Sequence, residues 1–125
     1  MREAELQILS HRILEFLGAP KTSLEIHLIS EKLIRELNKK FRGKDKPTNV
    51  LSFEYPEDFP NISKKRNIGQ IYLCPTYIKN HNENIDLMLV HGILHLLSFN
   101  HEKNSDRIKM EKLEKKTLSW LKIQS

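Results

Sequence analysis

Three of the six histidines fall within eleven residues, HGILHLLSFNH, and their spacing is that of a metal site. His91 and His95 are four residues apart, so on a helix they project from the same face about one turn apart. Two imidazoles placed in this way can both reach one zinc ion at the roughly 2.0–2.1 Å of a zinc–nitrogen bond. His101 lies beyond that helical face, so the chain must turn back after Leu97 for it to become the third ligand.

A site with three protein ligands leaves one position of tetrahedral zinc open for water or substrate, which is typical of a catalytic metal. The ordinary alternative is that two helix histidines are satisfied by hydrogen bonds and the third lies on the surface. The apolar neighbours Leu89, Val90, Leu94 and Leu96 argue against it, because burying two unliganded imidazoles among them is costly. The pattern therefore predicts one catalytic Zn²⁺ per chain.

The histidine offsets match the long zinc motif of metzincin proteases, H-E-x-x-H-x-x-G-x-x-H, with one decisive difference. Those enzymes need a glutamate directly after the first histidine as general base, and Gly92 occupies that position here. Glycine has no group that can activate water. We instead expect Gly92 to mark a close approach of the helix to a strand.

The elements that must position these histidines follow from the hydrophobic periodicity of the chain. We expect helices over residues 3–17, after Ser30, from Pro75, over 84–97 and after Ser105, the last with Ile108, Leu113, Leu118 and Leu121 inward, and strands over 23–29, 49–53 and 68–73. This order predicts an α+β fold in which a small mixed β-sheet of three or four strands packs against about four or five helices. We expect residues 1–125 to form a single domain.

The composition excludes several classes of protein. With 38% hydrophobic and 30% charged residues, and no apolar run near the roughly 20 residues of a membrane span, we expect a cytoplasmic protein without membrane contact. The N-terminal ten residues are too charged and too periodic for a signal peptide. Cys74 is the single cysteine, so neither an internal disulfide nor a cysteine-rich zinc ribbon can form.

The net charge of +5 and the pI of about 9.4 favour a polyanionic partner, and the positions of the basic residues favour it more strongly. One cluster lies in residues 39–46 and consists of Lys39, Lys40, Arg42, Lys44 and Lys46, opposed by Asp45 alone. A second cluster covers residues 64–66. A solvated charged surface would explain either, but two basic loops beside apolar strands are better suited to holding phosphates.

At this point the sequence resembles the YbeY endoribonucleases, a family acting in rRNA maturation and ribosome quality control. The family motif is approximately H-G-x-L-H-L-x-G-Y-D-H, which matches residues 91–101. Upstream, NKKFRGKDKPTNVLSF at residues 38–53 matches N-x-x-[FY]-R-G-K-D-x-P-T-[DN]-V-L-S-F. A looser match is IGQIYL at residues 68–73, which is similar to the family strand L-G-D-I/L-x-I.

This resemblance implies a zincin-like fold, a catalytic zinc on His91, His95 and His101, and single-stranded RNA as substrate. It implies action on 16S rRNA near its 3′ end, with the small ribosomal subunit as partner and no organic cofactor. It also implies that Arg42 contributes to activity, since an arginine beside a metal can fork onto a phosphate. Lys44 and Lys46 are then expected to bind flanking phosphates.

Four departures from the family pattern bear on the chemistry: Ser98 for glycine, Phe99 for tyrosine, Asn100 for aspartate and Gln70 for aspartate. They leave the three ligands intact. The changes at residues 99, 100 and 70 remove a hydroxyl and two carboxylates that could move protons, whereas Ser98 replaces the glycine that would ease the turn between the ligands. They keep open a non-enzymatic alternative, a ribosome assembly factor in which zinc has only a structural role. The other alternative is a zinc peptidase, against which Gly92 counts.

Overall fold

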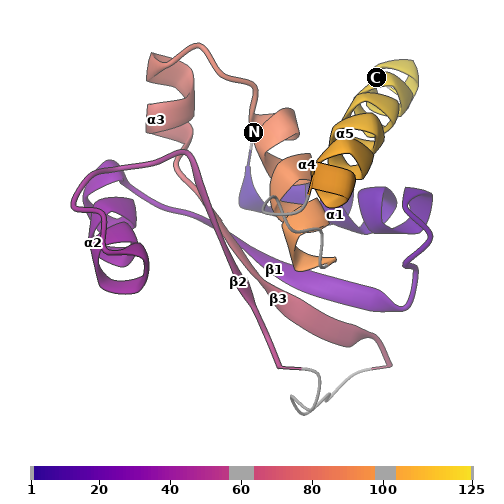
Figure 1. The fold of residues 1–125 in the computed structure, drawn as a ribbon, viewed down its shortest axis with the longest axis horizontal. Helices are drawn as coiled ribbons and strands as arrows, with labels where there is room; N and C mark the ends of the chain where they lie inside the picture. The colour runs from indigo at the N-terminus through magenta and orange to yellow at the C-terminus, as the bar shows by residue number, and fades with distance from the viewer. Residues whose placement is uncertain (1, 57–63, 98–103, 125) are drawn as a thin grey trace.

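The computed structural model describes residues 2–56, 64–97 and 104–124, and that part of the chain forms five helices and three strands (Figure 1). In chain order they are α1 (Glu3–Phe16), β1 (Thr22–Leu28), α2 (Glu31–Arg42), β2 (Val50–Glu54), β3 (Arg66–Leu73), α3 (Pro75–Asn80), α4 (Ile85–Leu96) and α5 (Asn104–Gln124). The expected α+β class is confirmed.

The sheet has the strand order β1-β3-β2, with β1 parallel and β2 antiparallel to β3. It is therefore the small mixed sheet that the sequence predicts. Ile71 at the centre of β3 lies opposite Ile26 of β1 and Ser52 of β2. This register places the middle of β2 beside the strand that carries the deepest core residues.

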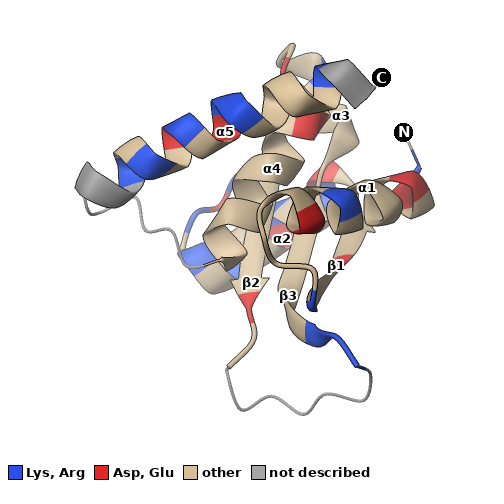
Figure 2. Cartoon of the chain, turned by 90° about the vertical axis from the view of Figure 1, so that its right-hand side faces the viewer, with Lys and Arg blue, Asp and Glu red and all other residues tan. Residues whose placement is uncertain are grey.

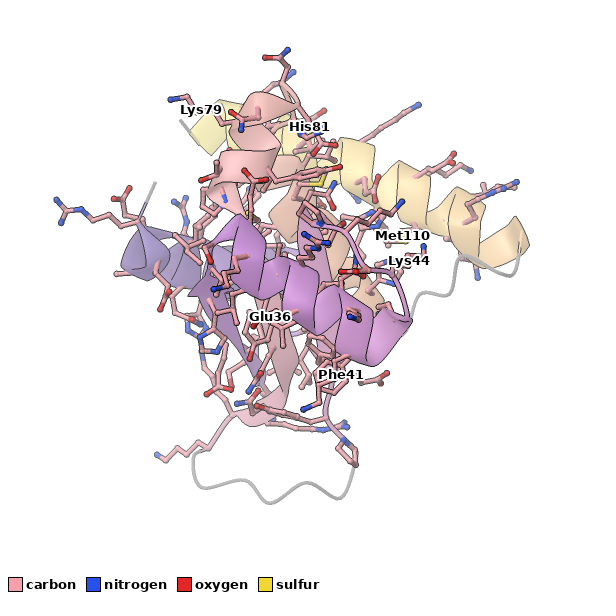
Figure 3. All side chains as sticks on the ribbon, turned by 90° about the vertical axis from the view of Figure 1, so that its left-hand side faces the viewer. Glu36, Phe41, Lys44, Lys79, His81 and Met110 are labelled. Carbon is pink, nitrogen blue, oxygen red and sulfur yellow. The ribbon has the colours of Figure 1, made fainter. Side chains whose placement is uncertain are left out.

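The helices cover both faces of the sheet. Helices α1, α4 and α5 lie on one face and α2 on the other (Figures 1 and 3). Side chains alternate between the faces along each strand, so Ile26 and Ile71 join the larger core with α1 and α4, whereas Leu51 packs against Ile34 of α2. Cys74 is buried in that second cluster, as expected of a small apolar residue.

The ends of the helices that flank the site follow from their capping residues. The Ser30 side chain accepts a hydrogen bond from the Leu33 backbone N–H at 3.2 Å and begins α2, as predicted. Gly43 ends α2 in the left-handed conformation, with φ of 72°. Asn84 caps α4 by accepting from the Asp86 backbone N–H at 2.8 Å.

The face that α5 turns toward the core differs in part from the face that the sequence predicts. Leu113, Leu118 and Leu121 pack against the core as predicted, but Ile108 is 51% exposed, so its inward placement was wrong. Met110 is buried in its place, at 1% exposure. Two residues turn a helix by about 200°, so a face that holds Met110 cannot hold Ile108. Lysine, arginine and acidic residues recur along the rest of α5 (Figure 2).

None of the helices that the structure describes is both long enough and apolar enough to cross a membrane.

Candidate active site

Helix α4 places His91 and His95 side by side, as their spacing predicts. Their Nε2 atoms are 3.2 Å apart, and the ring centroids are separated by 4.7 Å. Two nitrogen ligands on a tetrahedral zinc ion would be about 3.3–3.4 Å apart, because each zinc–nitrogen bond is roughly 2.0–2.1 Å long. The 3.2 Å separation is that of a hydrogen bond between the two rings, and it is also close to the spacing of two nitrogens on one zinc ion.

The other ring nitrogen of His91 faces a carboxylate from α5. Its Nδ1 lies 2.8 Å from Oε1 of Glu114, and the two side chains are only 32% and 19% exposed. The sequence analysis missed Glu114. The sequence did carry a signal that could have found it: Glu114 is a carboxylate on the side of α5 that faces the core, between Leu113 and the buried Thr117.

The predicted third ligand, His101, lies outside the described residues, as do Ser98, Phe99 and Asn100. Within residues 2–56, 64–97 and 104–124, no group of three or more histidine, cysteine or acidic side chains is placed to hold an ion. The metal site with His101 therefore stays a prediction.

Gly92 faces the sheet, which confirms the predicted close approach of α4 to a strand. A Cβ atom at this position would lie 3.1 Å from Cδ1 of Ile71 and 3.1 Å from Oγ of Ser52. The hydroxyl of Ser52 also donates a long hydrogen bond, 3.4 Å, to the Gly92 carbonyl. Residue 92 therefore contacts the strands, while His91 and His95 line an open cleft.

That cleft has a volume of about 750 Å³ and brings Arg42 together with the two histidines. Its walls are β2 and the preceding Asn49 on one side and α4, with Met88 and Leu96, on the other. Arg42 Nη2 donates to the Ser52 carbonyl at 2.9 Å, and its guanidinium lies 5.5 Å from the Phe53 ring centroid. These contacts hold the exposed Arg42 side chain against β2.

Lys44 and Lys46 line a second cavity, of about 390 Å³, on the other side of Arg42. Because Arg42 lines both cavities, the three predicted cationic residues lie along one continuous surface. Lys44 lies near the C-terminal end of α2 in the view of Figure 3.

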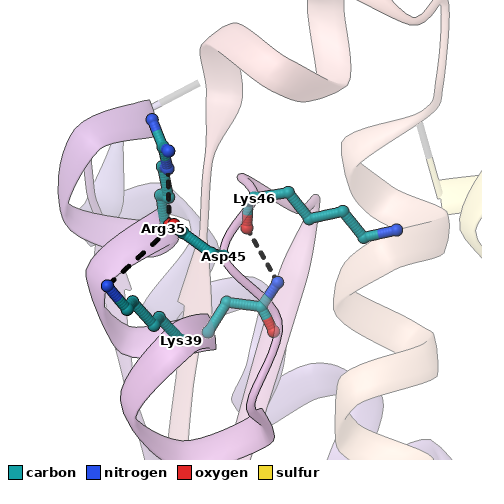
Figure 4. Close-up of polar contacts among 5 residues, drawn as sticks. Arg35, Lys39, Asp45 and Lys46 are labelled. Atoms are coloured by element: carbon teal, nitrogen blue, oxygen red, sulfur yellow. Dashed lines mark hydrogen bonds and ion pairs between the residues drawn. The ribbon is translucent and has the colours of Figure 1, made fainter.

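The loop carrying these lysines is held by a buried amide. Asn38 is 3% exposed, and its side-chain Nδ2 donates to the Lys46 carbonyl at 2.8 Å (Figure 4). Asp45 pairs with Arg35 of α2 at 2.8 Å, and this hydrogen bond lowers the pKa of the Asp45 carboxyl. The acidic residue of the loop is thus engaged by α2, and the Lys46 side chain extends away from α2 (Figure 4).

Gln70, which replaces the family's aspartate, lies on the opposite face of the sheet from Ile71 and so not at the histidine pair. Its Nε2 donates to Oε2 of Glu25 at 3.1 Å and to the Tyr55 hydroxyl at 2.6 Å. Its Oε1 accepts from the Tyr72 hydroxyl at 2.6 Å. Burial, with the hydrogen bond to Glu25, raises the pKa of Tyr55.

Comparison with known proteins identifies the family of the chain. The family model described as Endoribonuclease YbeY matches residues 1–122. The chain is similar to two proteins named Endoribonuclease YbeY. The protein from Sulfurihydrogenibium sp. is 40% identical, and the match covers 84% of this chain and 73% of that protein. The protein from Pseudoalteromonas translucida is 38% identical, and the match covers 82% of this chain and 72% of that protein.

A solved structure shares the fold. The solution structure of a Thermotoga maritima protein matches with a TM-score of 0.60 and 26% identity, covering 99% of this chain and 89% of that one. The whole-chain family match and the identities of the relatives are far beyond what a shared fold alone requires. The chain therefore belongs to the YbeY family of endoribonucleases.

Proposed function

We propose that this protein is a zinc-dependent endoribonuclease that cuts single-stranded RNA. Its substrate would be rRNA in the small ribosomal subunit, near the 3′ end of 16S rRNA, in rRNA maturation and ribosome quality control. The observation that carries the proposal is that paired imidazole nitrogens and an arginine line the same open cleft.

The donor set suits zinc. His91 and His95 would bind it through Nε2, and His101 would be the third ligand. Neutral imidazoles are good zinc ligands, and the 3.2 Å separation of the two Nε2 atoms is close to that required for a tetrahedral ion. When bound, zinc supplies Lewis acidity and lowers the pKa of coordinated water toward neutrality.

Arg42 would hold the scissile phosphate. One of its nitrogens is engaged by the Ser52 carbonyl, which orients the planar guanidinium and leaves further N–H groups able to fork onto two phosphate oxygens. Negative charge that develops on those oxygens during cleavage is stabilised by the adjacent cation. Lys44 and Lys46, in the neighbouring cavity, would bind the next phosphates along the strand.

A peptidase is a poorer match to the same cleft. Peptide hydrolysis on this motif needs a carboxylate base at residue 92, and that position is a buried glycine turned toward β2 and β3.

The test is cleavage of a single-stranded RNA by the purified protein. We expect cleavage to stop when a chelator removes the metal and to return when Zn²⁺ is added, with an unstructured protein left uncut. If three cationic residues contact phosphates, the logarithm of RNA affinity should fall with the logarithm of salt concentration with a slope of about −2. RNA cleavage that persists after full metal removal would contradict the proposal.

Arg42→Lys is expected to fold normally and to cut RNA on the order of 10²-fold more slowly, because a lysine cannot make the forked phosphate contact. The measurement is the cleavage rate at saturating RNA. The matched control is Arg2→Lys, which makes the same substitution at an exposed residue just before α1, outside both cavities and both basic clusters. Undiminished cleavage by Arg42→Lys would make Arg42 a structural residue that only braces β2.

A further inference from the structure

We propose that Glu114 positions His91 as a zinc ligand, so that α5 supplies part of the metal site although it contributes no ligand. The inference rests on the proposed zinc function and extends it to a residue outside the family motifs discussed above. Glu114 is a positioning residue: it contacts the imidazole on the side away from the metal.

The two ring nitrogens of His91 have different roles: Nδ1 donates to Glu114, and Nε2 is left for the metal. A carboxylate is only an acceptor, so Glu114 Oε1, 2.8 Å from Nδ1, requires the proton of the ring to be on Nδ1. The lone pair of a neutral ring is then on Nε2, the atom that lies 3.2 Å from Nε2 of His95. The hydrogen bond thus selects the tautomer that a metal needs and fixes the rotation of the ring.

The burial of Glu114 argues that this contact is more than a surface ion pair. The side chain is 19% exposed and lies among Leu113, Thr117 and the other residues that dock α5 on α4. Removing a carboxylate from water at such a helix interface costs free energy, and an apolar side chain there would dock the helices at least as well. A carboxylate is useful at this position because it acts on His91.

A consequence follows for α5. Helices α4 and α5 lie side by side, and Glu114 reaches His91 across their interface (Figures 1 and 2). Zinc affinity should therefore depend on the docking of a helix that lies beyond all three proposed ligands in the chain.

The experiment measures Zn²⁺ affinity of the full-length protein by competition with a chelating dye. Glu114→Gln should weaken Zn²⁺ binding about 10–100-fold, the usual effect of losing a hydrogen-bonding carboxylate behind a histidine ligand. Glu111→Gln, the same substitution on an exposed residue of the same helix, should leave the affinity unchanged. Glu114→Asp keeps a carboxylate acceptor and should therefore bind Zn²⁺ more tightly than Glu114→Gln.

A second measurement needs no substitution. In the zinc-loaded wild-type protein, ¹⁵N spectra of the histidine rings should show His91 protonated at Nδ1 and bound to metal at Nε2. Metal bound through Nδ1, or a Glu114→Gln variant with wild-type zinc affinity, would overturn the role of Glu114 while leaving the proposed function intact. A wild-type protein that binds no Zn²⁺ at all would instead overturn both.

Discussion

His95→Ala is expected to abolish stoichiometric zinc binding and to reduce RNA cleavage to the level of a reaction without enzyme. His95 provides one of the two Nε2 atoms that converge beside the cleft, and a site with two remaining histidines cannot hold zinc in a three-ligand catalytic geometry. Its side chain is only half-buried, so its removal should leave the fold in place.

The measurements are metal content after dialysis and cleavage of a single-stranded RNA. The matched control is His81→Ala, which removes an exposed histidine at the end of α3 whose ring stacks on Tyr77. It should retain both zinc and activity. RNA cleavage that survives both His95→Ala and chelation would indicate a contaminating nuclease, and the non-enzymatic assembly factor would then explain the site better.

Gly92→Glu is expected to prevent stable folding instead of creating a peptidase. The substitution restores the protease string H-E-x-x-H, but its Cβ would press on Ile71 and Ser52. Overpacking of this kind typically costs about 1–3 kcal/mol, and an unpaired carboxylate forced into the same contact costs several more. The sum is comparable with the whole stability of a small domain, about 5–15 kcal/mol.

Thermal unfolding by circular dichroism checks this expectation. The Gly92→Ala variant separates the effect of size from that of charge. Its added methyl group must displace Ile71 slightly, but alanine has about 1 kcal/mol more helix propensity than glycine. We therefore expect only a small change in the free energy of unfolding. Gly92→Gln has nearly the shape of the glutamate without its charge and should lie between the two. A Gly92→Glu protein that folds with the wild-type melting temperature and cuts peptides would refute the expectation.

The sequence alone determined the features that depend on local periodicity. The four-residue spacing of His91 and His95 places both on one face of any helix, whatever that helix packs against. A glycine within an otherwise largely apolar helix indicated the close approach that the structure shows at Gly92. Capping at Ser30 was also predictable, because its partner Leu33 is three residues away.

Features that depend on which distant elements meet were decided only by the tertiary structure. Arg42 reaches the histidine cleft because β2 lies between α2 and α4, an arrangement that no spacing within residues 38–53 encodes. Asn38 looks like any polar helix residue until the loop folds back and its amide meets the Lys46 carbonyl.

Helix α5 shows the physical reason most clearly. Its hydrophobic pattern predicts a helix with one buried face, but the rotation that buries Met110 and exposes Ile108 is chosen by the side chains of α4 and the core that it meets. The same rotation carries Glu114 to His91, 23 residues away in sequence. A hydrophobic pattern specifies which face of a helix is buried only to within a fraction of a turn. The 2.8 Å hydrogen bond between Glu114 and His91 depends on the exact rotation of α5, which is set only when α5 packs against α4.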